Sequence, residues 1–233
     1  MTVLFYRWPA AAKFGRTVPK AKFYEQSTIG AAVKHAFVSD VRRITWAYKL
    51  AESTINLPGS AEVPEIQVFE IDAKVDDVAE NVLATIDRAV RTPIIFEIRR
   101  NEGAREEIQM VAAHKELGKG APKVGLYFRT EWLPADTERA SLPTAIDLTS
   151  LYTALLQPLT PVESHAGDRV SDVVARLSTV RKLEREIAAL ERRLRNEPQL
   201  NRKVALRRSL RARQADLAGL TSATTRPAAG NTN

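Results

Sequence analysis

Residues 170–220 repeat apolar side chains at every third or fourth position, and this period constrains the fold more than any other feature. Such spacing places the apolar residues on one side of an α-helix, as in the contact seam of a coiled coil. Asn196-Glu197-Pro198 interrupts the repeat, because proline lacks an amide hydrogen and clashes with the preceding turn. The sequence therefore predicts two helices that fold into an antiparallel hairpin. The seam residues are Val173, Leu177, Val180, Leu183, Ile187, Leu190 and Leu194 before the break and Leu206, Leu210, Leu217 and Leu220 after it.

The predicted hairpin also holds the whole positive excess of the chain. Residues 170–220 contain 13 Lys and Arg against 6 Asp and Glu, a net charge of +7. Residues 1–169 contain 21 basic and 22 acidic residues, and the segment after residue 220 adds only Arg226. This asymmetry is typical of a surface for nucleic acid or for an acidic partner. An arginine-rich coiled coil that faces only solvent has the same composition.

Upstream of the hairpin, short stretches of two-residue alternation are separated by stretches of helical spacing. We expect helices over 28–37, 76–90 and 147–157, and strands over 41–50, 54–57, 65–74, 93–98, 106–113 and 123–130. This order is typical of a mixed α/β (α+β) domain around one central mixed sheet. The predicted organisation is an irregular arm (1–27), the mixed α/β domain (28–160), the basic hairpin (170–220) and a disordered tail (221–233).

Composition excludes several classes of site. The chain contains no cysteine, which rules out disulfides, thiolate nucleophiles and zinc sites built on cysteine. The apolar run Val3–Tyr6 is too short for a signal peptide, and no segment approaches the roughly 20 apolar residues of a membrane helix. A cytoplasmic protein without membrane contact is therefore expected.

Several short motifs are spread along most of the chain: Lys22–Tyr24, Ile44–Leu50, Thr54–Leu57, Glu65–Ile71, Ile86–Ala89, Pro93–Phe96, Tyr127–Trp132 and Gln199–Val204. Together they resemble a bacterial family known as domain of unknown function 4391. The resemblance implies an accessory protein encoded beside DNA methyltransferases and helicases in restriction or phage-defence loci, with no established activity.

One charged triplet offers a catalytic alternative. The predicted order of helix, three strands, helix and strand matches the core of restriction-endonuclease-like folds, where acids and a lysine hold Mg²⁺ and activate water. Residues two apart on a strand share a face, so Glu70, Asp72 and Lys74 could converge on a pocket. The partner acid should come from the preceding strand, but Asn56 stands there and Glu52 precedes it. A solvated strand end that leads into a capped helix is the more common explanation of such a triplet.

Other motifs carry weaker signals. His35, His114 and His165 show no metal-ligand spacing, and Gly118-Lys119-Gly120 lacks the spacing of a phosphate-binding loop. Trp46 and Tyr48 alternate along one strand and should share a face, where aromatic residues more often pack against a helix than stack on bases.

The basic hairpin favours a non-enzymatic binding subunit, and the family resemblance implies that it is an accessory subunit of a DNA-modifying or helicase-associated restriction or phage-defence assembly. The hairpin would bind DNA, or a partner protein such as a methyltransferase or helicase, or a second copy of the chain. A metal-dependent nuclease that uses Asp72 and Lys74 and a coiled-coil adaptor without DNA contact remain alternatives. No cofactor is expected apart from Mg²⁺ in the nuclease. The predicted binding residues are Arg202, Lys203, Arg207, Arg208 and Arg211.

Overall fold

The computed structural model describes residues 5–24, 29–103, 105–117, 122–159 and 170–222. The chain divides into two compact units, residues 1–160 and residues 161–233. The first unit is mixed α+β and the second is helical, which confirms the predicted fold class. No helix among the described residues is long and apolar enough to cross a bilayer.

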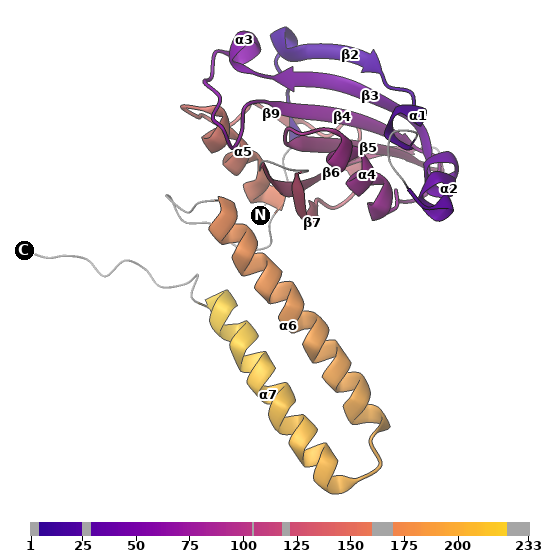
Figure 1. The fold of residues 1–233 in the computed structure, drawn as a ribbon, viewed down its shortest axis with the longest axis vertical. Helices are drawn as coiled ribbons and strands as arrows, with labels where there is room; N and C mark the ends of the chain where they lie inside the picture. The colour runs from indigo at the N-terminus through magenta and orange to yellow at the C-terminus, as the bar shows by residue number, and fades with distance from the viewer. Residues whose placement is uncertain (1–4, 25–28, 104, 118–121, 160–169, 223–233) are drawn as a thin grey trace, which may run out of the picture. The chain divides into compact units, whose positions relative to one another are not determined.

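A seven-stranded mixed sheet forms the centre of the first unit (Figure 1). Its order is β2-β3-β4-β5-β6-β7, and the short strand β8 pairs with β6. Strands β4 and β5 are parallel and joined through helix α4, whereas all other neighbours in the sheet run antiparallel. The strands are β2 (Lys13–Thr17), β3 (Val41–Leu50), β4 (Ile66–Ala73), β5 (Ile94–Glu102), β6 (Arg105–Glu116), β7 (Lys123–Arg129) and β8 (Leu133–Pro134).

Helices and two further short strands complete this unit. Strands β1 (Phe5–Tyr6) and β9 (Arg139–Ala140) pair in parallel, separately from the main sheet. The Tyr152 hydroxyl of α5 donates a 2.7 Å hydrogen bond to the Ala113 carbonyl of β6. The helices are α1 (Ala21–Tyr24), α2 (Ala31–Ser39), α3 (Glu52–Ile55), α4 (Glu80–Ala89) and α5 (Leu148–Leu156), with 3₁₀ turns at Ala10–Ala12 and Gln157–Leu159.

Both faces of the central strands are buried. Alternate residues of a strand point to opposite faces of its sheet. Phe69, Ile71 and Phe96 belong to one core cluster, which includes residues of α2 and α4. Val68 and Ile95 point to the opposite face and are also fully buried. Burial on both sides explains why these strands read as nearly continuous apolar runs.

A buried ion pair ties the end of α4 to β6. Lys115 Nζ lies 2.7 Å from Asp87 Oδ1, and the two side chains are 0% and 1% exposed. The same ammonium donates to the carbonyls of Asp87, Val90 and Thr92, and the Tyr127 hydroxyl donates to the Asp87 carboxylate. Burial raises the pKa of Asp87 and lowers the pKa of Lys115, because desolvation outweighs their mutual attraction. The pair therefore fixes where α4 ends and adds little net stability.

The predicted irregular arm is wrong over Lys13–Thr17, which forms the edge strand β2 and pairs with β3. Gly15 has a φ of +66°, and the register shifts between Lys13 and Arg16. This irregularity hides the two-residue alternation that would reveal a strand. Phe5 is buried as well, so the segment belongs to the domain. The predicted tail lies outside the described residues, apart from the last two residues of helix α7 below.

The predicted strand over 54–57 is also wrong, because those residues lie in and just after the helical turn α3. The Thr54 hydroxyl accepts a 2.9 Å hydrogen bond from the Ala51 amide, which closes the turn. Asn56 ends it in the left-handed region, with a φ of +55° that asparagine tolerates well. A hydroxyl that bonds to the local backbone thus overrides the β propensity of threonine and isoleucine.

Trp46 and Tyr48 do not share a face, contrary to the alternation in the sequence. Trp46 pairs with Phe69 of β4 whereas Tyr48 pairs with Val68, so the register shifts by one residue between them. A β-bulge of this kind sends the following side chain to the other face. Trp46 stacks on Phe69 with ring centroids 5.8 Å apart, as expected for core packing.

Candidate nucleic-acid interface

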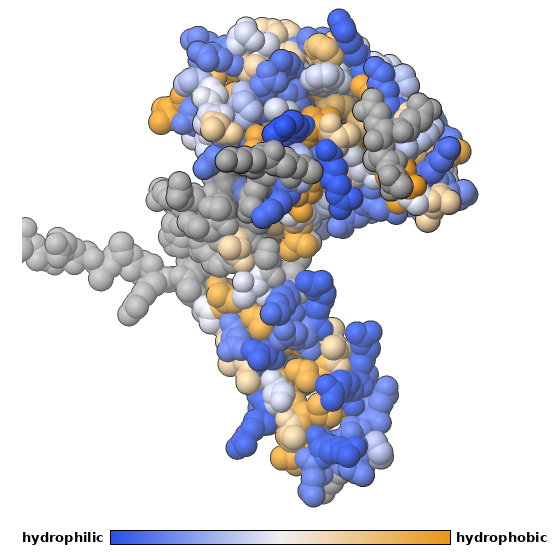
Figure 2. All heavy atoms as spheres, viewed as in Figure 1, coloured by the Kyte–Doolittle hydropathy of each residue, from blue (hydrophilic) through white to orange (hydrophobic). Residues whose placement is uncertain are grey.

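The second unit is an antiparallel helical hairpin of α6 (Val170–Asn196) and α7 (Leu200–Ser222). The two helices pack along each other, and Figure 2 shows apolar residues between them with hydrophilic residues on both sides. The side chains of Val173 and Leu177 lie outside the described set. The remaining seam residues are buried (Val180, Leu183) or half-buried (Ile187, Leu190, Leu194, Leu206, Leu210, Leu217, Leu220), which confirms the predicted seam.

The predicted binding residues of α7 differ in exposure. Arg202, Arg207, Arg208 and Arg211 are exposed, whereas Lys203 is half-buried at the edge of the seam. No described acidic side chain lies within 4.0 Å of any of the five basic groups. The described acids of the hairpin therefore do not neutralise these five charges.

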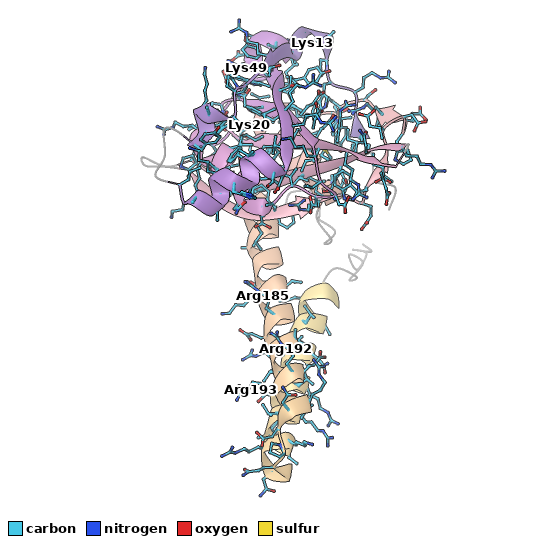
Figure 3. The ribbon with its side chains drawn as sticks, turned by 90° about the vertical axis from the view of Figure 1, so that its right-hand side faces the viewer. Lys13, Lys20, Lys49, Arg185, Arg192 and Arg193 are labelled. Atoms are coloured by element: carbon cyan, nitrogen blue, oxygen red, sulfur yellow. The ribbon has the colours of Figure 1, made fainter. Side chains whose placement is uncertain are left out.

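The end of α6 adds three arginines that the predicted set of binding residues omits. Arg192, Arg193 and Arg195 are exposed, and they too have no described acid within ion-pair distance. Figure 3 labels Arg192 and Arg193 on this helix. The signal was available in the sequence, because residues 192–211 contain eight basic residues and one acid, Glu197. We call these eight residues the cationic tip: Arg192, Arg193, Arg195, Arg202, Lys203, Arg207, Arg208 and Arg211.

At the end of the hairpin away from the α6–α7 turn, an arginine is paired with acids. Arg213 there is held by Glu186 of α6 at 3.3 Å and by Asp216 of its own helix at 2.9 Å. These three residues also line a groove of about 640 Å³ between the helices. Arg213 is thus partly neutralised, whereas the basic groups of the tip have no described acid within ion-pair distance.

The hairpin has exposed basic side chains but no aromatic side chain on which a base could stack. Residues 170–222 contain no Phe, Tyr, Trp or His. Proteins that bind single strands without sequence preference commonly stack bases on such rings. A surface of arginine and lysine alone recognises the phosphate backbone, and releases counterions when it binds.

The sheet domain separates the members of the proposed nuclease triplet. Glu70 and Asp72 lie on one face of β4, where Asp72 pairs with Arg43 at 2.7 Å and Glu70 lies 3.8 Å from Arg99. Lys74 follows the end of β4, and its ammonium donates to the Val38 carbonyl at 2.8 Å. Neither carboxylate lies within ion-pair distance of that ammonium.

Charged groups around Glu70 shift the pKa of its carboxyl group. Burial raises the pKa of Glu70, the guanidinium of Arg99 lowers it, and the carboxylate of Glu97 raises it further. The sequence offers Asn56 and Glu52 near the position expected for the partner acid. Glu52 lies in α3 and Asn56 directly follows it, so neither residue stands on a strand beside β4. Among the described residues, no group of three acids or histidines is arranged to hold a metal ion.

Glu97 is a buried acid that the sequence analysis did not single out. It is fully buried on β5, where its carboxylate accepts hydrogen bonds from the Trp8 indole at 2.7 Å and from Arg139 at 2.7 and 3.0 Å. Arg139 also donates to the Tyr6 carbonyl at 2.8 Å. Burial lowers the pKa of Arg139, but the hydrogen bonds and charge of Glu97 outweigh this and raise it. This network fastens β1 and β9 to the sheet.

The remaining motifs add no further site. His35 lies in α2 and His114 in β6, whereas His165 and Gly118–Gly120 lie outside the described residues. The Arg100 guanidinium lies over the Trp132 ring, 4.2 Å from the ring centroid, so this ring already makes a cation–π contact within the domain.

Comparison with known proteins identifies a family for this chain. A family model described as "Domain of unknown function (DUF4391)" matches residues 7–217, and so covers both units. No curated protein and no solved structure matches the chain.

Proposed function

We propose that this chain, which belongs to the DUF4391 family, is a non-enzymatic accessory subunit that holds DNA through its cationic tip. The proposed setting is a restriction or phage-defence assembly that contains a DNA methyltransferase or a helicase. This setting follows from the family resemblance, whereas the contact with DNA follows from the hairpin itself.

One observation carries the proposal: residues 192–211 contain eight basic side chains and a single acidic one, Glu197. Seven of them are exposed, and none has a described acid within ion-pair distance. Concentrated positive charge that is not neutralised internally attracts a polyanion and gains affinity from counterion release. Contacts of this type are independent of base sequence.

A protein partner at the tip is less well supported. Protein interfaces depend on buried anchors, most often aromatic residues and arginine, surrounded by other apolar contacts. Among the described residues of the hairpin, Val204 is the one large apolar side chain that is well exposed, at 58%. The tip therefore offers charge without an apolar centre, which fits a phosphate backbone better than a protein.

The proposal predicts salt-sensitive binding that depends on α7. The full chain should bind a fluorescent DNA duplex in an anisotropy titration, with affinity falling on the order of 100-fold or more between 50 and 200 mM salt. The triple variant Arg207→Glu, Arg208→Glu, Arg211→Glu lowers the net charge of the tip from +7 to +1. We expect it to bind at least ~100-fold more weakly and to show a salt slope smaller by about 3.

A matched control places the same charge change on the sheet domain. Lys13, Arg42 and Lys123 are exposed there, and changing all three to Glu alters the net charge of the chain equally. This control should keep near-normal affinity if the tip holds the DNA. Equal weakening by both triple variants would show only a dependence on total charge. An absence of duplex binding at low salt would overturn the proposal and favour the adaptor.

A further inference from the structure

The arginines of the cationic tip lie on two opposite sides of the hairpin. An α-helix turns by about 100° per residue, so a residue two positions away lies about 160° around the helix in one direction or the other. Arg192 is two residues from both Leu190 and Leu194, which face α7 in the seam. It therefore points away from α7, and Arg193 and Arg195 lie to either side of it.

The same relation holds on α7. Arg208 is two residues from both Leu206 and Leu210, which face α6, so it points away from α6. Arg207 and Arg211 extend this basic face along the helix. The exposed triplets Arg192, Arg193, Arg195 (the α6 face) and Arg207, Arg208, Arg211 (the α7 face) thus have their central arginines directed oppositely.

A single straight duplex cannot use both central arginines. Packed helices have axes about 8–10 Å apart, and each helix with its side chains is about 10 Å wide, so the two outward faces lie roughly 20 Å apart. A duplex against one face leaves the arginines of the other face exposed and without counter-charge. The charge that remains attracts a second polyanion.

From this arrangement we infer that one hairpin holds two DNA duplexes at once, one on the α6 face and one on the α7 face. The inference rests on the proposed function, since it needs the tip to bind DNA. It adds a specific activity: the chain bridges two DNA segments, by backbone contacts alone, without requiring a second copy of itself. An accessory subunit with this activity would hold distant parts of one DNA molecule together.

A capture assay tests the bridge. Beads that carry an unlabelled duplex are mixed with a free fluorescent duplex and the full-length chain, and the fluorescence retained on the beads is measured. Two variants remove one face each without reversing charge: Arg192→Gln, Arg193→Gln, Arg195→Gln and Arg207→Gln, Arg208→Gln, Arg211→Gln. Glutamine has nearly the helix propensity of arginine, so both variants should stay folded, which circular dichroism verifies.

We expect the wild-type chain to capture the second duplex and both variants to lose capture to background. Each variant should still bind one duplex on the face that it keeps, up to about 10-fold more weakly than the wild type at low salt, because neutral glutamines remove three contacts without the repulsion that three glutamates add. Loss of capture in only one variant would mean that two copies each use the same face, and would overturn the inference. Wild-type binding without capture would also overturn it while leaving the proposed function intact. No binding of any duplex would overturn the proposed function itself.

Discussion

Replacing Lys115 by methionine is expected to lower the free energy of unfolding of the sheet domain by about 3–5 kcal/mol. The substitution leaves the Asp87 carboxylate buried without its cation and removes the donor from three carbonyls at the end of α4. An unpaired charge in an apolar interior costs far more than the pair contributes. Urea denaturation followed by tryptophan fluorescence measures this domain selectively, because all three tryptophans lie in it.

Two further variants separate the ion pair from general effects of losing a lysine. Lys123→Met removes an exposed lysine from β7 and should change stability by no more than about 0.5 kcal/mol. The double variant Asp87→Asn, Lys115→Met removes both charges, so its loss should be smaller than the sum of the two single losses by about 1–3 kcal/mol. Additive losses would show that the two side chains do not act as a pair.

Local patterns predicted much of the sheet domain but missed elements set by backbone geometry. The strand predicted over 41–50 has the observed bounds of β3, because its alternation and β-branched residues agree with its surroundings. The Gly15 irregularity, the register shift before Tyr48 and the Thr54 turn each depend on one residue that leaves the regular pattern. Periodicity is judged over a window of many residues, so it cannot locate a single residue that departs from the pattern.

The candidate interface was more predictable than the buried networks. Charge and helical period are local properties, so the hairpin and its basic α7 face could be read from the sequence. The two opposite faces could have been found from the spacing of Arg192 and Arg208 relative to the leucines. The pairing of Asp87 with Lys115 joins residues 28 positions apart, and that of Glu97 with Arg139 joins residues 42 positions apart. No local pattern specifies such partners.

Arg139→Leu is expected to destabilise the sheet domain by about 2–4 kcal/mol, somewhat less than Lys115→Met because Arg139 is 24% exposed. Among the described residues, the fully buried Glu97 carboxylate would keep the Trp8 indole as its one side-chain donor. Arg139→Lys should recover part of the loss, since an ammonium cannot reproduce the two parallel bonds of the guanidinium. Arg42→Leu, which removes an exposed arginine from β3, serves as the control and should be nearly neutral.

Hydrogen exchange gives the same prediction a local readout. The Arg7 amide donates to the Ala140 carbonyl at 2.7 Å, next to the β1–β9 pairing that Arg139 fastens to the sheet. Arg139→Leu should therefore accelerate exchange at Arg7 more than in the interior of β5, because a local opening costs less than global unfolding. Equal acceleration at both places would mean that the N-terminal strand and the sheet unfold as one unit. Unchanged exchange at Arg7, with stability equal to that of Arg42→Leu, would show that Arg139 holds neither the strand nor Glu97.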